Sequence, residues 1–571
     1  MSPASPESSL GAHLAYKPQP LKFGTSGRRG LIVDLTQLEI YINVLGELRY
    51  LQALPPSQGG IQRGDEFYYA YDLRPSSIHY VEPNRGGLCQ AVERALKDAG
   101  MRPISLGAIP TPALTLFALQ RGKGSIMVTG SHIPFDRNGY KLNTSLGELL
   151  KKDEQPINES VEVIRKTILE QPFTESLFSE QGMLREGGSP LVTPIPDGKS
   201  EYIQRYLDFF KGDTLQGVKL LVYQHSAVGR DLIFELLQAL GAEVVAAGRS
   251  ETFVPIDTEA IDQAQLDTVQ KLVDSTGEKF DAVISTDGDS DRPLLLAPED
   301  GKLSFFSGDL LGMVVAEFLG ADAVVVPIST NDAIDRGPLA QVLGPKTKIG
   351  SPYVIAGMQD AVARGNRRVL GWEANGGFLT GSEIEIDGKK LPALPTRDAV
   401  LPLLCVLFAA RKRQTTVPAL FNSLPARFSR ASVIRNFPRP TSAKIVQRFS
   451  PPADHIKGVL YSDDGINPLD SNGKVVSGGT EDESHFNQIR RDLQQVFTAK
   501  AGFSPVKMTN YTDGIRVNFS NGDVAHIRPS GNADELRIYS VSDTKARADD
   551  ICNQGTAEPN GLLRQLARFV E

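Results

Sequence analysis

The stretch Phe280–Leu296, FDAVISTDGDSDRPLLL, contains the pattern that decides the fold class. Its first seven residues are mostly apolar and β-branched, which is typical of a strand buried inside a sheet. An acidic, glycine-containing loop, Ser285–Pro293, follows, and then a second apolar run begins. Ligands of open α/β sheets bind at the carboxyl ends of strands, so this loop is a candidate functional site.

The same kind of strand recurs on both sides of this stretch. Between the strands lie helical patterns such as Arg85–Ala99, which ends at Gly100. Apolar strands that alternate with helices predict largely parallel sheets covered by helices on both faces. The other predicted strands are Phe67–Asp72, Ser125–Gly130, Val218–His225, Asp322–Ile328 and Arg368–Glu373.

The C-terminal part has a different pattern. GIRVNFSNGDVAHIRPSG alternates apolar and polar residues around Asn521-Gly522, a strong signal for a β-hairpin. We therefore expect an α+β domain with an antiparallel sheet. Residues 172–200 and 425–450 have the composition of linkers, and residues 450–510 look like an insertion of unknown role.

Length and composition limit the classes of protein to consider. The chain has 571 residues, which at roughly 150 residues per domain suggests about four domains. The net charge of −7 argues against a general nucleic-acid or membrane binder. Three distant cysteines form neither a disulfide framework nor a zinc motif. Residues 1–20 show no secretory signal and the apolar run Ala399–Ala410 is too short to span a membrane, so we expect a cytoplasmic protein.

The acidic loop is the first of four loops that can carry chemistry. Asp287, Asp289 and Asp291 alternate over five residues, so that their carboxylates can converge on one hard cation. A calcium EF-hand would need glycine at the sixth position and glutamate at the twelfth, where Arg292 and Pro298 stand. Three carboxylates that leave places for water or a phosphate oxygen suit Mg²⁺. The alternative is a solvated acidic turn.

The second loop is VTGSHIPFDRNGYK, Val128–Lys141. A strand leads directly to Ser131, beside His132, and Lys141 lies on the returning segment. A serine in such a place can act as a nucleophile or phosphoryl carrier if a base and a cation lie close. The alternative is a hydroxyl-capped turn with a surface histidine.

The third and fourth loops can bind a sugar and a phosphate. In GWEANGGF, Glu373 and Asn375 could hold adjacent sugar hydroxyls, or could belong to a glycine-rich turn with a capping asparagine. In HIRPSGNADELRIY, two arginines flank a glycine turn and could form a phosphate cradle, or could be surface residues of a hairpin. The residues of this fourth loop are Arg528, Ser530, Gly531, Asn532 and Arg537.

Together with KFGTSGRRG (Lys22–Gly30), these loops in this order resemble the α-D-phosphohexomutase superfamily. The motifs are FGTSGRRG, TGSHIP…NGYK, DGDSDR, the E-x-N-G-G loop and RPSGNADELR. The resemblance implies three related mixed α/β domains and a C-terminal α+β domain around a central cleft. Placed on this chain, the expected parts are a flexible leader 1–20, domain I 21–180 with the serine loop, domain II 190–301 with the metal loop, domain III 302–424 with the sugar loop and domain IV 425–571 with the phosphate loop.

The resemblance also implies roles for individual residues. Ser131 matches the serine that is phosphorylated in the active enzyme, and Lys141 matches a general acid or base. Arg292 ends the metal loop and is expected to touch the reacting phosphate. Mg²⁺ would be held by Ser131, Asp287, Asp289 and Asp291. The other implied catalytic residues are His132 and Arg29, and the other implied substrate-binding residues are Glu373, Asn375, Arg528, Ser530, Gly531, Asn532 and Arg537.

The implied activity is the Mg²⁺-dependent interconversion of hexose 6-phosphate and hexose 1-phosphate, for mannose or glucose, through phosphoserine and a bisphosphosugar. A bisphosphosugar such as glucose 1,6-bisphosphate is the expected activator. The implied partner is a small hexose phosphate, with no nucleic acid or membrane, and the chain is expected to be a monomer or homodimer.

Two alternatives to this activity stay open. EANGG partly resembles the N-acetylglucosamine-phosphate mutases, so an N-acetylglucosamine- or glucosamine-phosphate mutase is one alternative. The other is a non-catalytic sugar-phosphate-binding protein. It is motivated by Gly130, Ile133 and Ser351, where many members of the superfamily carry alanine, asparagine and histidine.

Overall fold

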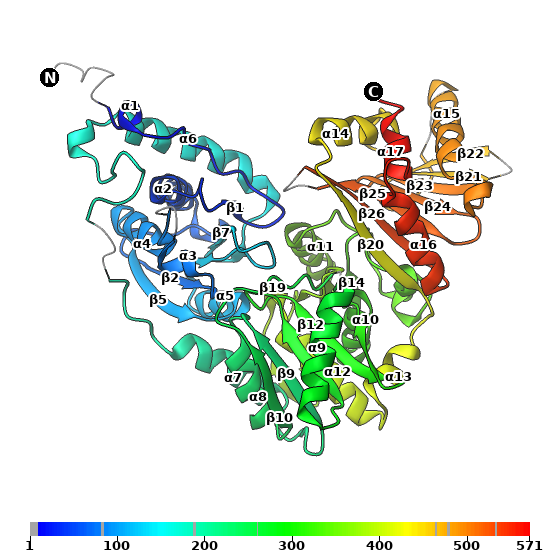
Figure 1. Cartoon of the computed structure of the whole chain (residues 1–571), viewed down its shortest axis with the longest axis horizontal. Helices are drawn as coiled ribbons and strands as arrows, with labels where there is room; N and C mark the ends of the chain where they lie inside the picture. Colours follow the sequence, from blue (N-terminus) through cyan, green and yellow to red (C-terminus); the bar gives the residue numbers. More distant parts are fainter. Residues whose placement is uncertain are drawn as a thin grey trace. The chain divides into compact units, whose positions relative to one another are not determined.

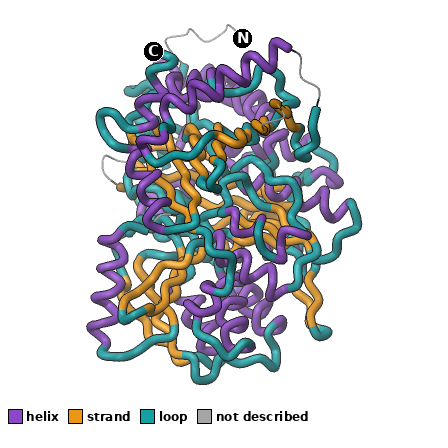
Figure 2. Tube along the Cα trace, turned by 90° about the vertical axis from the view of Figure 1, so that its right-hand side faces the viewer, coloured by secondary structure: helices purple, strands orange, loops and turns teal. Residues whose placement is uncertain are grey.

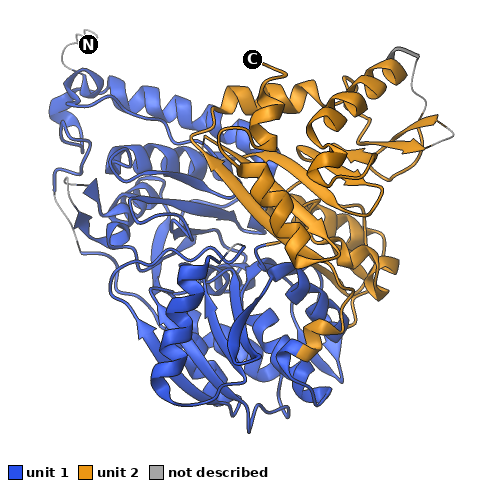
Figure 3. Ribbon diagram, turned by 45° about the vertical axis from the view of Figure 1, so that its right-hand side comes forward, with its two compact units in different colours: residues 1–319, 375–418 blue, residues 320–374, 419–571 orange. Residues whose placement is uncertain are grey.

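The computed structural model describes residues 9–81, 85–186, 190–259, 261–462, 465–476, 480–530 and 534–571 (Figure 1). The chain forms two compact units (Figure 3). Unit 1 comprises residues 1–319 and 375–418, and unit 2 comprises residues 320–374 and 419–571. Helices and strands are interspersed along the chain (Figure 2). Within the described ranges, no helix has the length and apolar character needed to cross a membrane.

The first sheet of unit 1 has the strand order β1-β7-β6-β2-β5, with β8 paired to β7. Strand β2 runs parallel to β5 and β6, whereas β7 is antiparallel to β6 and β1. The strands are β1 (Arg28–Leu31), β2 (Glu66–Tyr71), β5 (Arg102–Ala108), β6 (Ser125–Val128), β7 (Arg137–Thr144) and β8 (Gly147–Glu148).

Helices cover this sheet with apolar faces. Helix α2 packs against α4 and α6, and its leucines and isoleucines share one core with β2 and β6. Helix α5 contacts β2 and β6 as well. The helices are α2 (Gln37–Ala53), α4 (Leu88–Asp98), α5 (Thr111–Gln120) and α6 (Glu154–Glu170). Smaller elements are α1 (Leu10–His13), α3 (Pro75–Ile78), β3 (Tyr80–Val81) and β4 (Arg85–Gly86).

The second sheet of unit 1 has the order β10-β9-β11-β12-β13. The strands β10, β9 and β11 are parallel, and β12 and β13 return antiparallel. Its strands are β9 (Lys219–His225), β10 (Glu243–Arg249), β11 (Ala282–Thr286), β12 (Pro293–Glu299) and β13 (Lys302–Phe306). The neighbouring helices are α7 (Asp197–Phe209), α8 (Arg230–Ala239) and α9 (Gln263–Thr276).

Both of these sheets are mixed rather than largely parallel. A parallel return needs a crossover of a dozen or more residues, whereas an antiparallel return needs only a short loop. The serine loop between β6 and β7 and the acidic loop between β11 and β12 are such short returns. The two loops therefore lie at the carboxyl ends of β6 and β11, which run parallel to β2 and β9.

Unit 1 is completed by helices α10 (Gly308–Leu319) and α12 (Val400–Lys412), which pack against each other. The apolar run Ala399–Ala410 forms most of α12, and its residues from Val400 to Ala410 are buried. Strand β16 pairs antiparallel with β19, and β17 with β18. Their bounds are β16 (Phe378–Thr380), β17 (Ile384–Ile386), β18 (Lys389–Leu391) and β19 (Leu394–Asp398).

Unit 2 begins with the parallel pair β14 (Ala323–Val325) and β15 (Val369–Trp372) and helix α11 (Ser351–Ala363). Its larger part is an antiparallel sheet of order β20-β26-β25-β24-β23-β21-β22. The strands are β20 (Phe428–Arg435), β21 (Gly458–Ser462), β22 (Gly465–Leu469), β23 (Val506–Asn510), β24 (Ile515–Phe519), β25 (Val524–Pro529) and β26 (Glu535–Ser542). The helices are α14 (Arg439–Arg448), α15 (Thr480–Val496), α16 (Lys545–Thr556) and α17 (Leu562–Ala567), and the short α13 (Val417–Asn422) precedes them.

The predicted hairpin around Asn521-Gly522 is confirmed, because β24 and β25 pair directly across this turn. The prediction of a linker at 425–450 is wrong, since these residues form β20 and α14. Residues 450–510, expected to be an insertion of unknown role, form regular elements of this part of unit 2. Strands β21, β22 and β23 are part of the same sheet, and α15 buries Phe486 and Ile489 in its core.

Two further expectations change at the N-terminal end. The predicted helix Arg85–Ala99 starts later, at Leu88, because Arg85 and Gly86 form β4 and Gly87 has a left-handed backbone. Within the leader that composition predicts to be flexible, Leu10 is fully buried in the core of the first sheet. Its backbone N–H donates to the carbonyl of Gln171 over 2.9 Å.

Candidate active site

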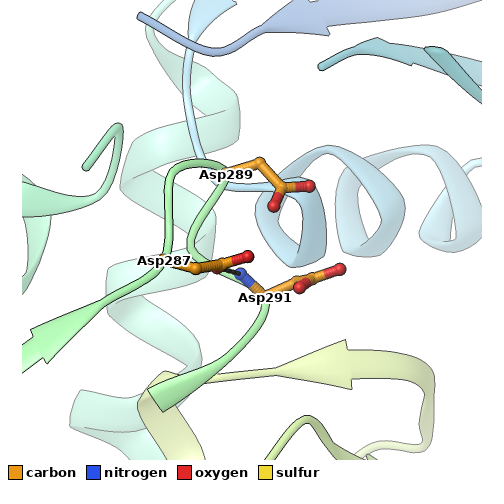
Figure 4. Close-up of side chains that lie close together, drawn as sticks. All are labelled: Asp287, Asp289 and Asp291. Atoms are coloured by element: carbon orange, nitrogen blue, oxygen red, sulfur yellow. Dashed lines mark hydrogen bonds between the residues drawn. The ribbon is translucent and has the colours of Figure 1, made fainter. Parts of the chain in front are cut away.

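The acidic loop between β11 and β12 brings its three carboxylates together. One oxygen from each of Asp287, Asp289 and Asp291 lies within 4.8 Å of the others, and all three residues are buried. Figure 4 shows the three side chains pointing to the same side of the loop. The loop is tightened by Ser290, whose φ is +57° and whose hydroxyl accepts a hydrogen bond from the Gly229 N–H at 2.9 Å.

The hydrogen bonds of the triad leave some carboxylate oxygens open. Oδ1 of Asp287 accepts the backbone N–H groups of Asp291 and Arg292, each over 3.2 Å. Oδ1 of Asp289 and Oδ1 of Asp291 are buried and have no hydrogen-bond partner in the described part of the chain. Buried oxygens without a donor are costly unless a cation is bound, so the donor set fits a hard divalent ion such as Mg²⁺.

Burial and the neighbouring charges shift the pKa values of two carboxyls of the triad in opposite directions. Burial, together with the charges of Asp289 and Asp291, raises the pKa of Asp287 well above its usual range. Burial also disfavours the charged form of Asp291, but Arg397 and Lys141 hold the pKa of that carboxyl well below its usual range. Like charges in one buried site are stable only when cations neutralise them, as they do here.

The serine loop between β6 and β7 is held by a buried arginine that the sequence analysis did not single out. The Arg74 guanidinium donates to the carbonyls of Pro134 at 2.7 Å, Arg137 at 2.8 Å and Ser131 at 3.0 Å, and also to that of Ile133. Its guanidinium carbon lies 3.8 Å from the centre of the Phe253 ring.

Glycine at position 130 belongs to the same arrangement. A Cβ at Gly130 would lie 2.6 Å from the guanidinium carbon of Arg74, so the glycine leaves room for this arginine. Asp72 accepts the hydroxyl of Thr129 at 2.8 Å and the N–H of Gly130 at 3.2 Å. Position 130, where many members of the superfamily carry alanine, is therefore glycine for a local reason, namely the close packing of Arg74.

Ser131 points into the acidic triad. Its hydroxyl donates to Oδ2 of Asp287 over 2.6 Å, and its φ of +54° is a strained value for a residue with a side chain. Nδ1 of His132 lies 3.4 Å from the same hydroxyl. Strained serines of this kind persist only where surrounding contacts fix them, as the bonds from Arg74 and Asp72 to this loop do.

Lys141 reaches the triad from the next strand. Its Nζ lies 2.6 Å from Oδ2 of Asp289 and 2.6 Å from Oδ2 of Asp291. Thr111, at the start of α5, donates its hydroxyl to the same oxygen of Asp289 over 2.6 Å. The predicted serine, lysine and aspartates therefore form one buried cluster.

Two further predicted arginines belong to this cluster. Burial and the nearby charge of Arg292 lower the pKa of Arg29 to about 10. In the described structure, Nε and Nη2 of Arg29 and Nε of Arg292 are buried without a hydrogen-bond partner. Nε of Arg292 lies 3.6 Å from Asp291 and 3.9 Å from Asp287. Buried guanidinium groups with open donors suit a bound phosphate.

The predicted sugar-binding pair is divided between the units. Glu373 follows β15 in unit 2 and is buried, whereas Asn375 belongs to unit 1. Oδ1 of Asn375 accepts the N–H of Gly377 at 3.0 Å, and its backbone carbonyl accepts the hydroxyl of Thr258 at 2.8 Å. The asparagine oxygen thus has the capping role that was the alternative reading of this motif.

The predicted phosphate loop lies in unit 2. Arg528 on β25 and Arg537 on β26 are directly opposite each other in the antiparallel ladder. Nε of Arg528 lies 3.2 Å from Asp513, and Nη2 of Arg537 lies 3.3 Å from Glu535. Like charges across a ladder are unfavourable, so an anion would stabilise this pair. Ser530 donates its N–H to the Glu535 carbonyl at 3.0 Å, while Gly531 and Asn532 lie outside the described residues.

The residues that sequence reasoning missed are Arg74, Thr111 and Arg397. Two of them follow a recognisable signal, because Arg74 stands two residues after Asp72 at the end of a strand and Thr111 opens a helix after Pro110. Arg397 precedes the apolar helix α12 without any pattern of its own. Its contact with Asp291, 106 residues away, depends on tertiary structure.

Comparison with known proteins agrees with this geometry. Residues 20–167, 200–301 and 307–428 match the models of phosphoglucomutase/phosphomannomutase alpha/beta/alpha domains I, II and III. A phosphomannomutase of Sinorhizobium fredii is 36% identical over 95% of this chain and 99% of its own length. A phosphomannomutase of Salmonella muenchen is 34% identical over 93% of this chain and 94% of its own length.

Among solved structures, a phosphoglucomutase/phosphomannomutase family protein of Burkholderia thailandensis has the same fold. Its TM-score is 0.60 at 18% identity, and the match covers 95% of this chain and 97% of that protein. The matched domains contain the serine, the lysine and the aspartates that lie together in unit 1. The chain belongs to the phosphoglucomutase/phosphomannomutase family.

Proposed function

We propose that this protein is a Mg²⁺-dependent phosphohexomutase that interconverts the 6-phosphate and 1-phosphate of mannose or glucose. The observation that carries the proposal is the 2.6 Å hydrogen bond from the Ser131 hydroxyl to Asp287, inside a buried carboxylate triad. The similarity to two phosphomannomutases over nearly the whole chain supports the same activity.

In the proposed reaction, Ser131 carries the phosphoryl group. A hydroxyl of the hexose phosphate attacks the phosphorus of phosphoserine 131, and the bond from phosphorus to Oγ breaks as the new P–O bond forms. The proton of the attacking hydroxyl leaves to a base, and the product is a bisphosphosugar. In the second half, Oγ of Ser131 attacks the phosphorus of the other phosphate and its proton leaves to a base. The bond from that phosphorus to the sugar oxygen breaks, and this oxygen takes up a proton to become a hydroxyl.

The residues around Ser131 have separate tasks in this proposal. Asp287 accepts the hydroxyl proton of Ser131 and orients Oγ. Asp287, Asp289 and Asp291, with Ser131, would hold Mg²⁺, which when bound neutralises phosphoryl charge. We propose Lys141, whose Nζ lies 2.6 Å from oxygens of two of the aspartates, as the general acid or base.

The remaining residues are proposed to bind phosphate and sugar. Arg29 and Arg292 offer buried N–H groups to the reacting phosphate, and His132 lies beside Oγ. In unit 2, the opposed pair Arg528 and Arg537 has the character of a site for the other phosphate. We propose Glu373 and Asn375 as readers of sugar hydroxyls, and Ser530, Gly531 and Asn532 as further phosphate donors. The proposed activator is a bisphosphosugar such as glucose 1,6-bisphosphate.

The test is a Ser131→Ala variant. Without Oγ no phosphoserine can form, so we expect loss of the interconversion of 1- and 6-phosphohexoses and loss of the mass increase of one phosphate after treatment with glucose 1,6-bisphosphate. Near wild-type turnover in Ser131→Ala would contradict the proposal. A wild-type protein that binds hexose phosphate but never gains phosphate would instead be a non-catalytic sugar-phosphate-binding protein.

The preferred sugar is tested by the same assay. The EANGG motif favours N-acetylglucosamine phosphate as a second candidate. We expect kcat/KM to be higher for mannose and glucose phosphates than for N-acetylglucosamine or glucosamine phosphate. The reverse order would replace the proposed substrate without changing the reaction.

A further inference from the structure

Arg397 is a buried arginine at the metal loop, and none of the loop motifs contains it. It lies on β19, its side chain is 2% exposed, and its partner Asp291 is 1% exposed. The sequence position gives no hint of this pairing, because 106 residues separate the two.

The contacts of Asp291 are concentrated on one of its two oxygens. Nε and Nη2 of Arg397 lie 3.0 Å and 2.9 Å from Oδ2, and Nζ of Lys141 lies 2.6 Å from the same oxygen. Oδ1 is buried and accepts no hydrogen bond from the described residues. Nε of Arg292 lies 3.6 Å from Oδ1, which is too far for a hydrogen bond.

The surroundings of Arg397 fix it in this orientation. A Cβ at Gly377 would lie only 2.5 Å from Cδ of Arg397, so the second glycine of EANGG makes room for its side chain. The next residue, Asp398, is held by the hydroxyls of Tyr202, at 2.6 Å, and Tyr206. It also accepts the N–H of Val400 at 2.8 Å. Because the aliphatic part of the Arg397 side chain packs against Gly377 and the next residue is held by hydrogen bonds, the guanidinium has little freedom to leave Asp291.

A carboxylate with one oxygen occupied by three N–H donors can offer only the other oxygen to a cation. Ca²⁺ takes six to eight oxygen ligands and accepts bidentate carboxylates in flexible geometries. Mg²⁺ needs a nearly ideal octahedron, for which single carboxylate oxygens are suitable. An Asp291 restricted to Oδ1 therefore disfavours the higher coordination numbers.

We propose that Arg397 is a positioning residue that makes Asp291 a one-oxygen ligand and so favours Mg²⁺ over Ca²⁺ at the triad. The inference rests on the proposed use of Mg²⁺ by Asp287, Asp289 and Asp291. It adds a specificity role for a residue that lies outside the four loops. Partners behind metal ligands commonly change metal affinity 10- to 100-fold when they are removed.

The test measures metal binding without turnover. Full-length wild type, Arg397→Met and Arg397→Lys are titrated with Mn²⁺ by electron paramagnetic resonance, and Mg²⁺ and Ca²⁺ are then added as competitors. We expect the ratio of Mg²⁺ to Ca²⁺ affinity to fall about 10-fold in both variants. Lysine keeps the charge but not the two parallel donors, so restoration of the wild-type ratio by lysine would overturn the proposal.

The controls separate this inference from the proposed function. Arg413→Met removes an arginine of the same unit that pairs with Glu317 at 3.4 Å on the surface, and its ratio should equal that of wild type. If both metals bind more tightly to Arg397→Met by the same factor, the arginine acts through charge alone and the inference is wrong. A wild-type protein that binds no divalent ion would contradict the Mg²⁺ site itself, whereas unchanged ratios in the variants contradict only the role of Arg397.

Discussion

At the scale of single residues, Lys141 shows how this site balances its charges. Three buried carboxylates stand together, and the ammonium of Lys141 bridges two of them at 2.6 Å each. Arg397 and Arg292 supply the other positive charges close to Asp291. The cluster is thus nearly neutral before any phosphate arrives, which allows it to be buried at all.

Replacement of Lys141 by methionine tests its proposed part in the reaction. The loss of a positioned acid or base usually costs 10²- to 10⁴-fold in rate, so we expect kcat to fall by at least about 100-fold. The assay is the interconversion of hexose phosphates with added bisphosphosugar. Lys152→Met, at an exposed position of the same domain, is the matched control and should keep wild-type kcat. A kcat of Lys141→Met within about threefold of the kcat of Lys152→Met would rule out the proposed role of Lys141.

At the scale of elements, the serine loop depends on Arg74. This one side chain donates to three carbonyls of the loop between β6 and β7 and to that of Arg137 at the start of β7, and its Nε lies 3.3 Å from buried Asp72. The residues of this loop are in neither a helix nor a strand, so their backbone carbonyls do not receive the regular hydrogen bonds of secondary structure. Arg74 therefore takes the place of regular secondary structure beside the reactive serine.

Arg74→Met should destabilise unit 1. Removing one partner of a buried ion pair leaves an uncompensated charge on Asp72, at a cost of about 3–5 kcal/mol in the free energy of unfolding. Urea unfolding measures this cost, and intact mass after treatment with glucose 1,6-bisphosphate shows whether Ser131 still accepts phosphate; we expect less phosphorylation. Arg63→Met, at an exposed position, should change the free energy of unfolding by less than about 0.5 kcal/mol. If Arg74→Met lowers the free energy of unfolding by no more than Arg63→Met does, the four carbonyl contacts contribute little to stability.

Elements differed in how well the sequence predicted them. The strand Phe280–Thr286 and its acidic loop were predictable because apolar runs and alternating carboxylates are local patterns. Residues 450–510 were not, because β21 and β22 have only five residues each and α15 carries many polar residues, so these elements are recognised only by their partners in the fold. The same holds for Arg397, whose role comes from a contact with a loop of another sheet.

At the scale of the whole molecule, each unit buries a histidine that must stay neutral. His225 in unit 1 donates Nε2–H to the Thr286 carbonyl at 2.8 Å, and His526 in unit 2 donates to the Asp513 carbonyl at 2.6 Å. Burial lowers the pKa of His225 to about 4, and burial together with Arg516 lowers that of His526 to about 4. Both rings lie next to loops proposed to bind ligands, so acid would affect both units.

The direction of the pH effect follows from these pKa values. The ordinary pKa of histidine is about 6.5, so between pH 6.5 and 4 the unfolded chain binds protons that the folded chain does not. Stability is therefore complete above pH 6.5 and falls as the pH drops toward 4. Each histidine should cost roughly 2 kcal/mol of stability between pH 8 and pH 5. His225→Gln and His526→Gln keep a donor without a titrating ring, so in urea unfolding at these two pH values each should lose about 2 kcal/mol less than wild type. If the variants lose as much stability as wild type between pH 8 and pH 5, the acid sensitivity arises from the carboxylates instead.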